Sequence, residues 1–100
     1  MTFNFHPEAE AEFNAAIDWY EARSPGLGWD FANEIRAAIN RAVAMPLAWH
    51  ILEGDIRRSL VQRFPYGVLY VPESDQLTIL AIMHLRQRPG YWRNRTSTPQ

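Results

Sequence analysis

Cysteine and lysine are both absent from the 100 residues of the chain. Without cysteine there is no disulfide, no thiolate metal ligand and no cysteine nucleophile. Without lysine there is no lysine-based chemistry, and arginine cannot take its place because it stays protonated. Small secreted domains often depend on disulfides, so the absence of cysteine favours a reducing, cytoplasmic location.

Long apolar runs are also missing. No stretch approaches the roughly 20 apolar residues that a membrane-spanning helix needs, and the N-terminus lacks a signal-peptide pattern. No pair of histidines or carboxylates has the spacing of a metal site. We therefore expect a cytoplasmic protein with no membrane partner, no metal and no small-molecule cofactor.

Charge is distributed unevenly along the chain, although the net charge is only −1. Residues 1–55 hold nine acidic residues and three arginines, a balance of −6. Residues 56–100 hold two acidic residues and seven arginines, a balance of +5. This asymmetry favours an anionic partner for the C-terminal half.

The spacing of apolar residues predicts one short strand, two helices and three further strands, in the order β-α-α-β-β-β. Helical spacing follows Pro7 and ends before Ser24-Pro25-Gly26, and a second helix follows Leu27-Gly28. Residues 46–55 lose the pattern and are interpreted as a loop. Alternation with a period of two then predicts strands at 56–64, 66–71 and 77–83, after the first strand at 2–5.

These elements predict a two-layer α+β fold, in which an antiparallel helical hairpin packs on a mainly antiparallel four-stranded sheet. The strand at 77–83 is apolar on both faces, which places it in mid-sheet with the first strand docked beside it. At 47% hydrophobic residues the chain can bury the core of one domain, expected at residues 1–95. Residues 96–100 are expected to be a frayed tail.

Several short sequence words occur in a characteristic order, namely residues 15–20 (AAIDWY), 25–28 (PGLG), 57–58 (RR), 63–66 (RFPY), 68–70 (VLY) and 82–92 (IMHLRQRPGYW). In this order the chain resembles the RelE/ParE toxin superfamily. The resemblance implies the toxin of a type II toxin–antitoxin, plasmid-stabilisation-like system, which inhibits growth and is neutralised by a cognate antitoxin. Toxins with this fold divide between cleavage of ribosome-bound messenger RNA and poisoning of DNA gyrase, so the resemblance leaves the target open.

A ribonuclease needs a base, an acid and cations at the phosphate. The candidate catalytic residues, relevant only if the chain is a nuclease, are His84, Arg86, Arg57, Arg63 and Tyr91. Glu53 is a secondary candidate for carrying a proton. An alternative for His84 is a strand-end histidine that bonds a neighbouring carbonyl. Gly67 is a departure, because ribosome-dependent relatives carry an arginine after the residue that matches Tyr66.

Candidates for binding a target or partner are the arginines and aromatic residues outside that set: Arg58, Arg88, Trp92, Arg93, Arg95 and Trp29. Stacking combined with phosphate contact suits nucleic acid, and the same residues suit an acidic antitoxin segment. The alternative is a structural role without binding, in which the arginines keep the sheet face hydrated and the aromatic residues pack at the end of the core. Trp29 is predicted either to anchor a partner or to be packed by the loop after Pro46.

Three functions remain after this reading of the residues. A ParE-like toxin that grips its target, such as DNA gyrase, is preferred because it tolerates Gly67 and the absence of lysine. The alternatives are a RelE-like endoribonuclease acting on ribosome-bound messenger RNA and a degenerate, non-toxic module that only binds the antitoxin. Whether the chain is an enzyme is left open. The antitoxin is expected to be acidic where it covers residues 57–95.

Overall fold

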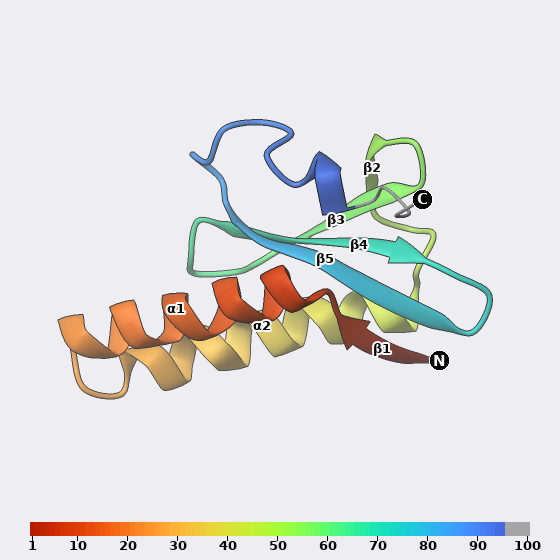
Figure 1. Cartoon of the computed structure of the whole chain (residues 1–100). Coiled ribbons are helices and arrows are strands. Elements are labelled where there is room, and N and C mark those ends of the chain that lie inside the picture. The colour runs from red at the N-terminus through yellow and green to blue at the C-terminus, as the bar shows by residue number, and fades with distance from the viewer. Residues whose placement is uncertain (96–100) are drawn as a thin grey trace.

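The computed structural model describes residues 1–95 (Figure 1). The predicted tail at residues 96–100 lies outside the described residues. The elements in chain order are β1 (Thr2–Phe5), α1 (Pro7–Arg23), α2 (Leu27–Ala44), β2 (His50–Glu53), β3 (Ile56–Leu60), β4 (Tyr66–Pro72), β5 (Gln76–His84) and the short 3₁₀ helix η1 (Arg93–Arg95). Neither helix in the described part of the chain has the length and apolar character needed to cross a membrane.

The helical hairpin forms where the sequence predicts it. Pro7 occupies the first turn of α1, and Nδ1 of His6 accepts a hydrogen bond from the backbone N–H of Glu8 at 3.1 Å. The carboxylate of Glu21 accepts from the backbone N–H groups of Gly26 and Gly28, at 2.9 and 3.0 Å. One side chain therefore joins the end of α1 to the start of α2.

The sheet has the strand order β1-β5-β4-β3-β2. β1 runs parallel to β5, and the other neighbouring pairs are antiparallel. Docking of the first strand beside the last one is therefore confirmed, as is the mid-sheet position of β5. The two-layer α+β architecture is also confirmed, with the helices covering one face of the sheet (Figure 1).

The prediction of four strands was wrong by one, because residues 46–55 contain β2 as well as turns. β2 lies at the sheet edge, is largely exposed, and shifts register between Ile51 and Glu53. An exposed, irregular edge strand has no apolar alternation to detect. β3 is shorter than predicted and ends at Leu60, before Arg63 adopts a left-handed backbone with a φ of 71°.

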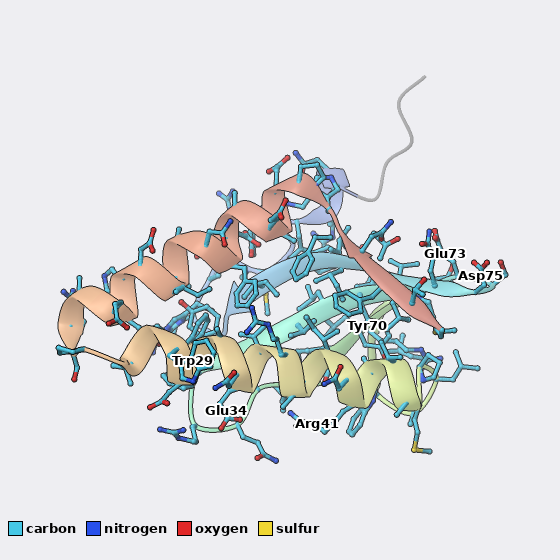
Figure 2. All side chains as sticks on the ribbon, turned by 90° about the horizontal axis from the view of Figure 1, so that it is seen from below. Trp29, Glu34, Arg41, Tyr70, Glu73 and Asp75 are labelled. Carbon is cyan, nitrogen blue, oxygen red and sulfur yellow. The ribbon has the colours of Figure 1, made fainter. Side chains whose placement is uncertain are left out.

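Both faces of the sheet are covered. The main core lies between the sheet and the helices, where the largest fully buried side chains include Phe31, Ile35 and Tyr70. Figure 2 views this helical layer from below, with Trp29, Glu34 and Arg41 along α2. A second cluster on the opposite side, here called the outer face, contains the buried residues Ile56, Leu69, Leu80, Ala81, Met83 and Trp92.

Residues 85–95, here called the C-terminal segment, supply Trp92 to this outer-face cluster. The tryptophan is 4% exposed, so it is a packing residue of the outer face. The same segment carries four of the seven arginines of the basic C-terminal half, and their positions therefore depend on how it is fastened to the sheet.

Candidate functional site

A groove of about 420 Å³ lies between α1 and the end of β5. It is lined by Glu12, Ala15, Ala16, Trp19, Tyr20, Tyr66, Ile82, His84, Gln87 and Tyr91. Two of the predicted catalytic residues, His84 and Tyr91, thus share one groove. No arginine of the described chain belongs to its lining, so the groove has no phosphate clamp of its own.

His84 is held by its immediate neighbours. Its Nδ1 accepts a hydrogen bond from the backbone N–H of Arg86 at 3.0 Å, and its ring meets that of Tyr66 edge-on at 5.1 Å. The neutral imidazole therefore carries its proton on Nε2. The expected alternative, a strand-end histidine with a local backbone bond, is close to what is found, although the partner is an N–H group and not a carbonyl.

Glu12 is the best-connected side chain of the groove. Its carboxylate accepts four hydrogen bonds: from Arg95 Nη1 and Nη2, both at 2.9 Å, from the Tyr91 hydroxyl at 2.8 Å, and from the Ile82 backbone N–H at 3.0 Å. The Arg95 side chain is only 6% exposed and also donates to the carbonyl of Leu80. Glu12 thus fastens the C-terminal segment to α1 and β5 together.

The Glu12–Arg95 contact satisfies backbone groups on an unpaired stretch of the sheet. β1 pairs with β5 only over residues 76–79, so the rest of that edge of β5 has no strand beside it. The Ile82 N–H and the Leu80 carbonyl on this stretch are bonded by Glu12 and Arg95 instead. Two charged side chains therefore complete the edge where the first strand ends.

Tyr91 is occupied by the same contact. Burial raises the pKa of Tyr91, and its hydrogen bond to Glu12 raises that pKa further. At neutral pH the phenol stays protonated and donates to Glu12, so it is a structural donor in this state and not a base.

Arg57 lies away from His84, and Arg63 faces acidic residues of α2. Nη1 of Arg57 donates to the carbonyls of Leu47 and Trp49, both at 2.9 Å. Arg57 is aligned through Tyr70 with Ile79, five residues before His84, which corresponds to about 17 Å along the strand. Arg63 is in the β3–β4 connection and lies 3.6 Å from both Asp30 and Glu34 of α2.

Arg86 follows His84 by two residues and is exposed. The ion pairs formed within residues 1–95 do not include it. The predicted catalytic set is therefore divided: His84 and Tyr91 line the groove, Arg86 follows His84 in the chain, Arg57 lies further along the sheet, and Arg63 faces acidic residues of α2. Their catalytic assignment stays a prediction.

The predicted binding residues also fall into two groups. Arg93 forms a two-pronged pair with Glu53, with nitrogen–oxygen distances of 2.8–3.0 Å, and Arg95 is bound by Glu12. Trp92 is buried, whereas Arg88 is exposed and Trp29 is 66% exposed. The loop after Pro46 does not cover Trp29, because it follows the opposite end of α2. Binding by these residues stays a prediction.

Glu12 was missed as a site residue by sequence reasoning. An acid near the N-terminal end of a helix needs no partner to account for it, because negative charge is favoured there. A signal was available, because Glu12 directly precedes the inward-facing Phe13 and one helical turn separates it from buried Ala16. A carboxylate at the border of an apolar stripe is partly buried and therefore requires a hydrogen-bond or ion-pair partner. The position of the stripe does not identify that partner.

Burial raises the pKa of all four tyrosines above the ordinary value of 10.0, namely Tyr20, Tyr66, Tyr70 and Tyr91. A raised folded-state pKa leaves stability unaffected below the unfolded-state value and lowers it as the pH rises further. Spectrophotometric titration should therefore show phenolate forming above pH 10, with the folded state losing stability over the same range. Tyr91→Phe should remove the last phenol to titrate. Complete titration near pH 10 with the fold intact would contradict this expectation.

Two helices on one face of a mixed five-stranded sheet define an α+β fold that also occurs in a solved structure described as "Chromosomal ParDE TA system from P. aeruginosa". The two align with a TM-score of 0.74 and 20% sequence identity, covering 86% of this chain and 97% of that one. The family model for the ParE toxin of the type II toxin–antitoxin system parDE matches residues 3–89, and the chain belongs to this family. A comparison with curated proteins gives no match.

Proposed function

We propose that this ParE-family toxin arrests growth in the cytoplasm by binding and poisoning DNA gyrase, without cleaving RNA, and that a cognate ParD-type antitoxin silences it. The observation that carries the proposal is the separation of the residues that a ribonuclease would need to bring together. Catalysis of RNA cleavage requires a base, an acid and cations around one phosphate.

The contacts of each candidate support a target-binding toxin. Arg57 is committed to two backbone carbonyls about 17 Å from His84 along the sheet. The Tyr91 hydroxyl is committed to Glu12, whose own charge is matched by Arg95. A phosphate entering the groove that contains His84 would meet no lining arginine from residues 1–95, so the groove offers no cation for the charge that develops during RNA cleavage.

A partner of the ParD type is supported by the family and by the related structure, whose description names a ParDE system. The charges support an acidic partner segment. Arg93 and Arg95 are neutralised by Glu53 and Glu12, whereas no ion pair within residues 1–95 includes Arg58, Arg86 or Arg88. The positive charge that remains available therefore belongs to the outer face and the first half of the C-terminal segment.

Induction of the toxin in bacteria, combined with assays on the purified protein, tests the proposal. We expect growth arrest with intact messenger RNA, and accumulation of cleaved DNA when gyrase is incubated with the purified toxin. With His84→Ala or Arg86→Ala, messenger RNA should stay as intact as with the wild type, because the proposal gives neither residue a role in cleavage. The control Arg36→Gln on the helical layer should leave toxicity within about twofold of the wild type, because surface substitutions away from a working site have small effects.

Two outcomes would overturn the proposal. Rapid loss of messenger RNA that His84→Ala or Arg86→Ala abolishes would assign the chain to the endoribonucleases. Normal growth during induction of the intact, folded protein would leave only antitoxin binding as a function.

A further inference from the structure

Arg58 occupies an unusual position on the outer face. Its side chain lies across Gly67 of the neighbouring strand, so closely that a methyl group added at Gly67 would be 3.0 Å from both Cγ and Cδ of the arginine. Gly67 stands where the related ribosome-dependent toxins carry an arginine. In this chain the side chain of a different arginine, Arg58, lies over that position. A side chain at position 67 would displace Arg58 from the surface of the sheet.

Within residues 1–95 the guanidinium of Arg58 has no hydrogen-bond or ion-pair partner. Its Nε is buried and makes no hydrogen bond within residues 1–95, and none of the ion pairs formed there includes it. A buried donor without a partner is costly, in contrast to an exposed arginine that water satisfies. Arg93, which lines the same hollow, already has the carboxylate of Glu53.

This hollow, here called the Arg58 pocket, measures about 280 Å³ and opens between β3 and the C-terminal segment. Its remaining walls are mainly apolar and are provided by Leu52, Met83, Leu85, Pro89 and Trp92. Among residues 1–95, Arg58 is thus the one cation of this pocket that has no carboxylate beside it, and the neighbouring wall suits an aliphatic or aromatic side chain. This combination fits an acidic residue with an apolar neighbour on the same peptide.

We propose that the Arg58 pocket binds a carboxylate side chain, flanked by an apolar residue, from the acidic segment of the antitoxin. The proposal rests on the proposed function in one respect, namely that an antitoxin silences this toxin. Arg58 supplies the planar fork that binds a carboxylate through two parallel hydrogen bonds, and the absence of a side chain at Gly67 leaves room for the arginine stem on the sheet.

A peptide fits better than nucleic acid. A nucleic-acid strand carries a charge on every phosphate and would need several unpaired cations along its path. The pocket offers one, Arg58, because the other lining arginine, Arg93, is paired with Glu53. An acidic and apolar peptide places one charge on Arg58 and buries its neighbour against Leu85 and Trp92.

Titration calorimetry of the full-length toxin with its cognate antitoxin tests this assignment. Arg58→Gln should weaken binding by about 30-fold, because it leaves a carboxylate of the partner buried without its cation. Arg58→Lys should recover part of the affinity, and Gly67→Ala should weaken binding by a smaller factor through displacement of the arginine stem. Arg36→Gln removes the same charge from the helical layer and should change affinity by less than about twofold.

Each variant is first compared with the wild type by circular dichroism and urea unfolding, and Arg58→Lys serves in place of Arg58→Gln if the latter does not fold. A double-mutant cycle with single Asp or Glu substitutions in the antitoxin should identify one carboxylate that couples to Arg58.

The outcomes separate the two claims. If the antitoxin does not bind the wild-type toxin, the proposed silencing fails, and this assignment fails with it. If the antitoxin binds Arg58→Gln and the wild type equally, only the assignment of the pocket is overturned. Unchanged antitoxin binding with lost toxicity would show that the pocket faces the cellular target, which also overturns the assignment.

Discussion

Replacing Glu12 with glutamine should lower the free energy of unfolding by about 3 kcal/mol, because breaking a buried charge pair from one side leaves the other charge uncompensated. Arg95 is 6% exposed and receives both of its close carboxylate contacts from Glu12, which is itself 23% exposed. Glutamine keeps the shape of the side chain but presents an NH₂ group to one set of donors. Glu8, at 3.5 Å, offers Arg95 only an exposed substitute.

Urea unfolding measures this loss, and Glu10→Gln provides the matched control. Glu10 lies on the same helix and is exposed, so its substitution should change stability by less than about 0.5 kcal/mol. Replacing Glu12 and Arg95 together with leucine should recover much of the loss, since neither charge is then buried alone. Equal stability of the Glu10→Gln and Glu12→Gln variants would refute the central role of Glu12.

Gly28→Ala should destabilise the protein by about 2 kcal/mol, because an inserted methyl group forces packed backbone apart. A Cβ atom at this position would lie 2.6 Å from the backbone carbonyl oxygen of Ile17 and 2.9 Å from Cβ of Glu21. The clash is therefore with the body of α1, which cannot move aside as a flexible side chain would. The hydrogen bond from Gly28 N–H to Glu21 would be strained as well.

Gly26→Ala is the control, because it replaces a glycine of the same turn without creating a steric clash. Gly26 has a φ of 88° but no atom within 4 Å of a built Cβ, so alanine there should cost only about 1 kcal/mol of backbone strain. Thermal unfolding of both variants measures the difference. The close approach of the helices would be disproved if Gly28→Ala were no less stable than Gly26→Ala.

The sequence predicted most of the fold because its helices and inner strands repeat with clear periods. The apolar stripes of the two helices, which include Phe13 on α1 and Phe31 on α2, face the sheet. β5, which is apolar on both faces, lies in mid-sheet. β2 escaped prediction because an exposed edge strand requires no apolar alternation. Its existence depends on pairing with β3, which is a property of the folded chain and not of residues 50–53 alone.

The candidate site was less predictable for a related reason. The types of residue were identified, but side-chain direction was not: neighbouring Arg57 and Arg58 point to opposite faces of one strand, and only Arg58 lines the outer-face pocket. Glu12 and Arg95 pair across 83 positions, which no local pattern reports. Hydrophobic spacing indicates what is buried, whereas the assignment of each acid to an arginine is decided only by the tertiary fold.

The parallel pairing of β1 with β5 has a consequence for the order of events during synthesis. Residues 2–5 have no strand to join until residues 76–79 have been made, and Arg95 must follow before Glu12 is satisfied. At typical rates of about 5–20 residues per second, the opening strand waits several seconds for its neighbour. A ribosome that has not yet translated residues 76–95 therefore holds a chain that cannot complete this sheet, so the toxin fold forms only after these residues have been made.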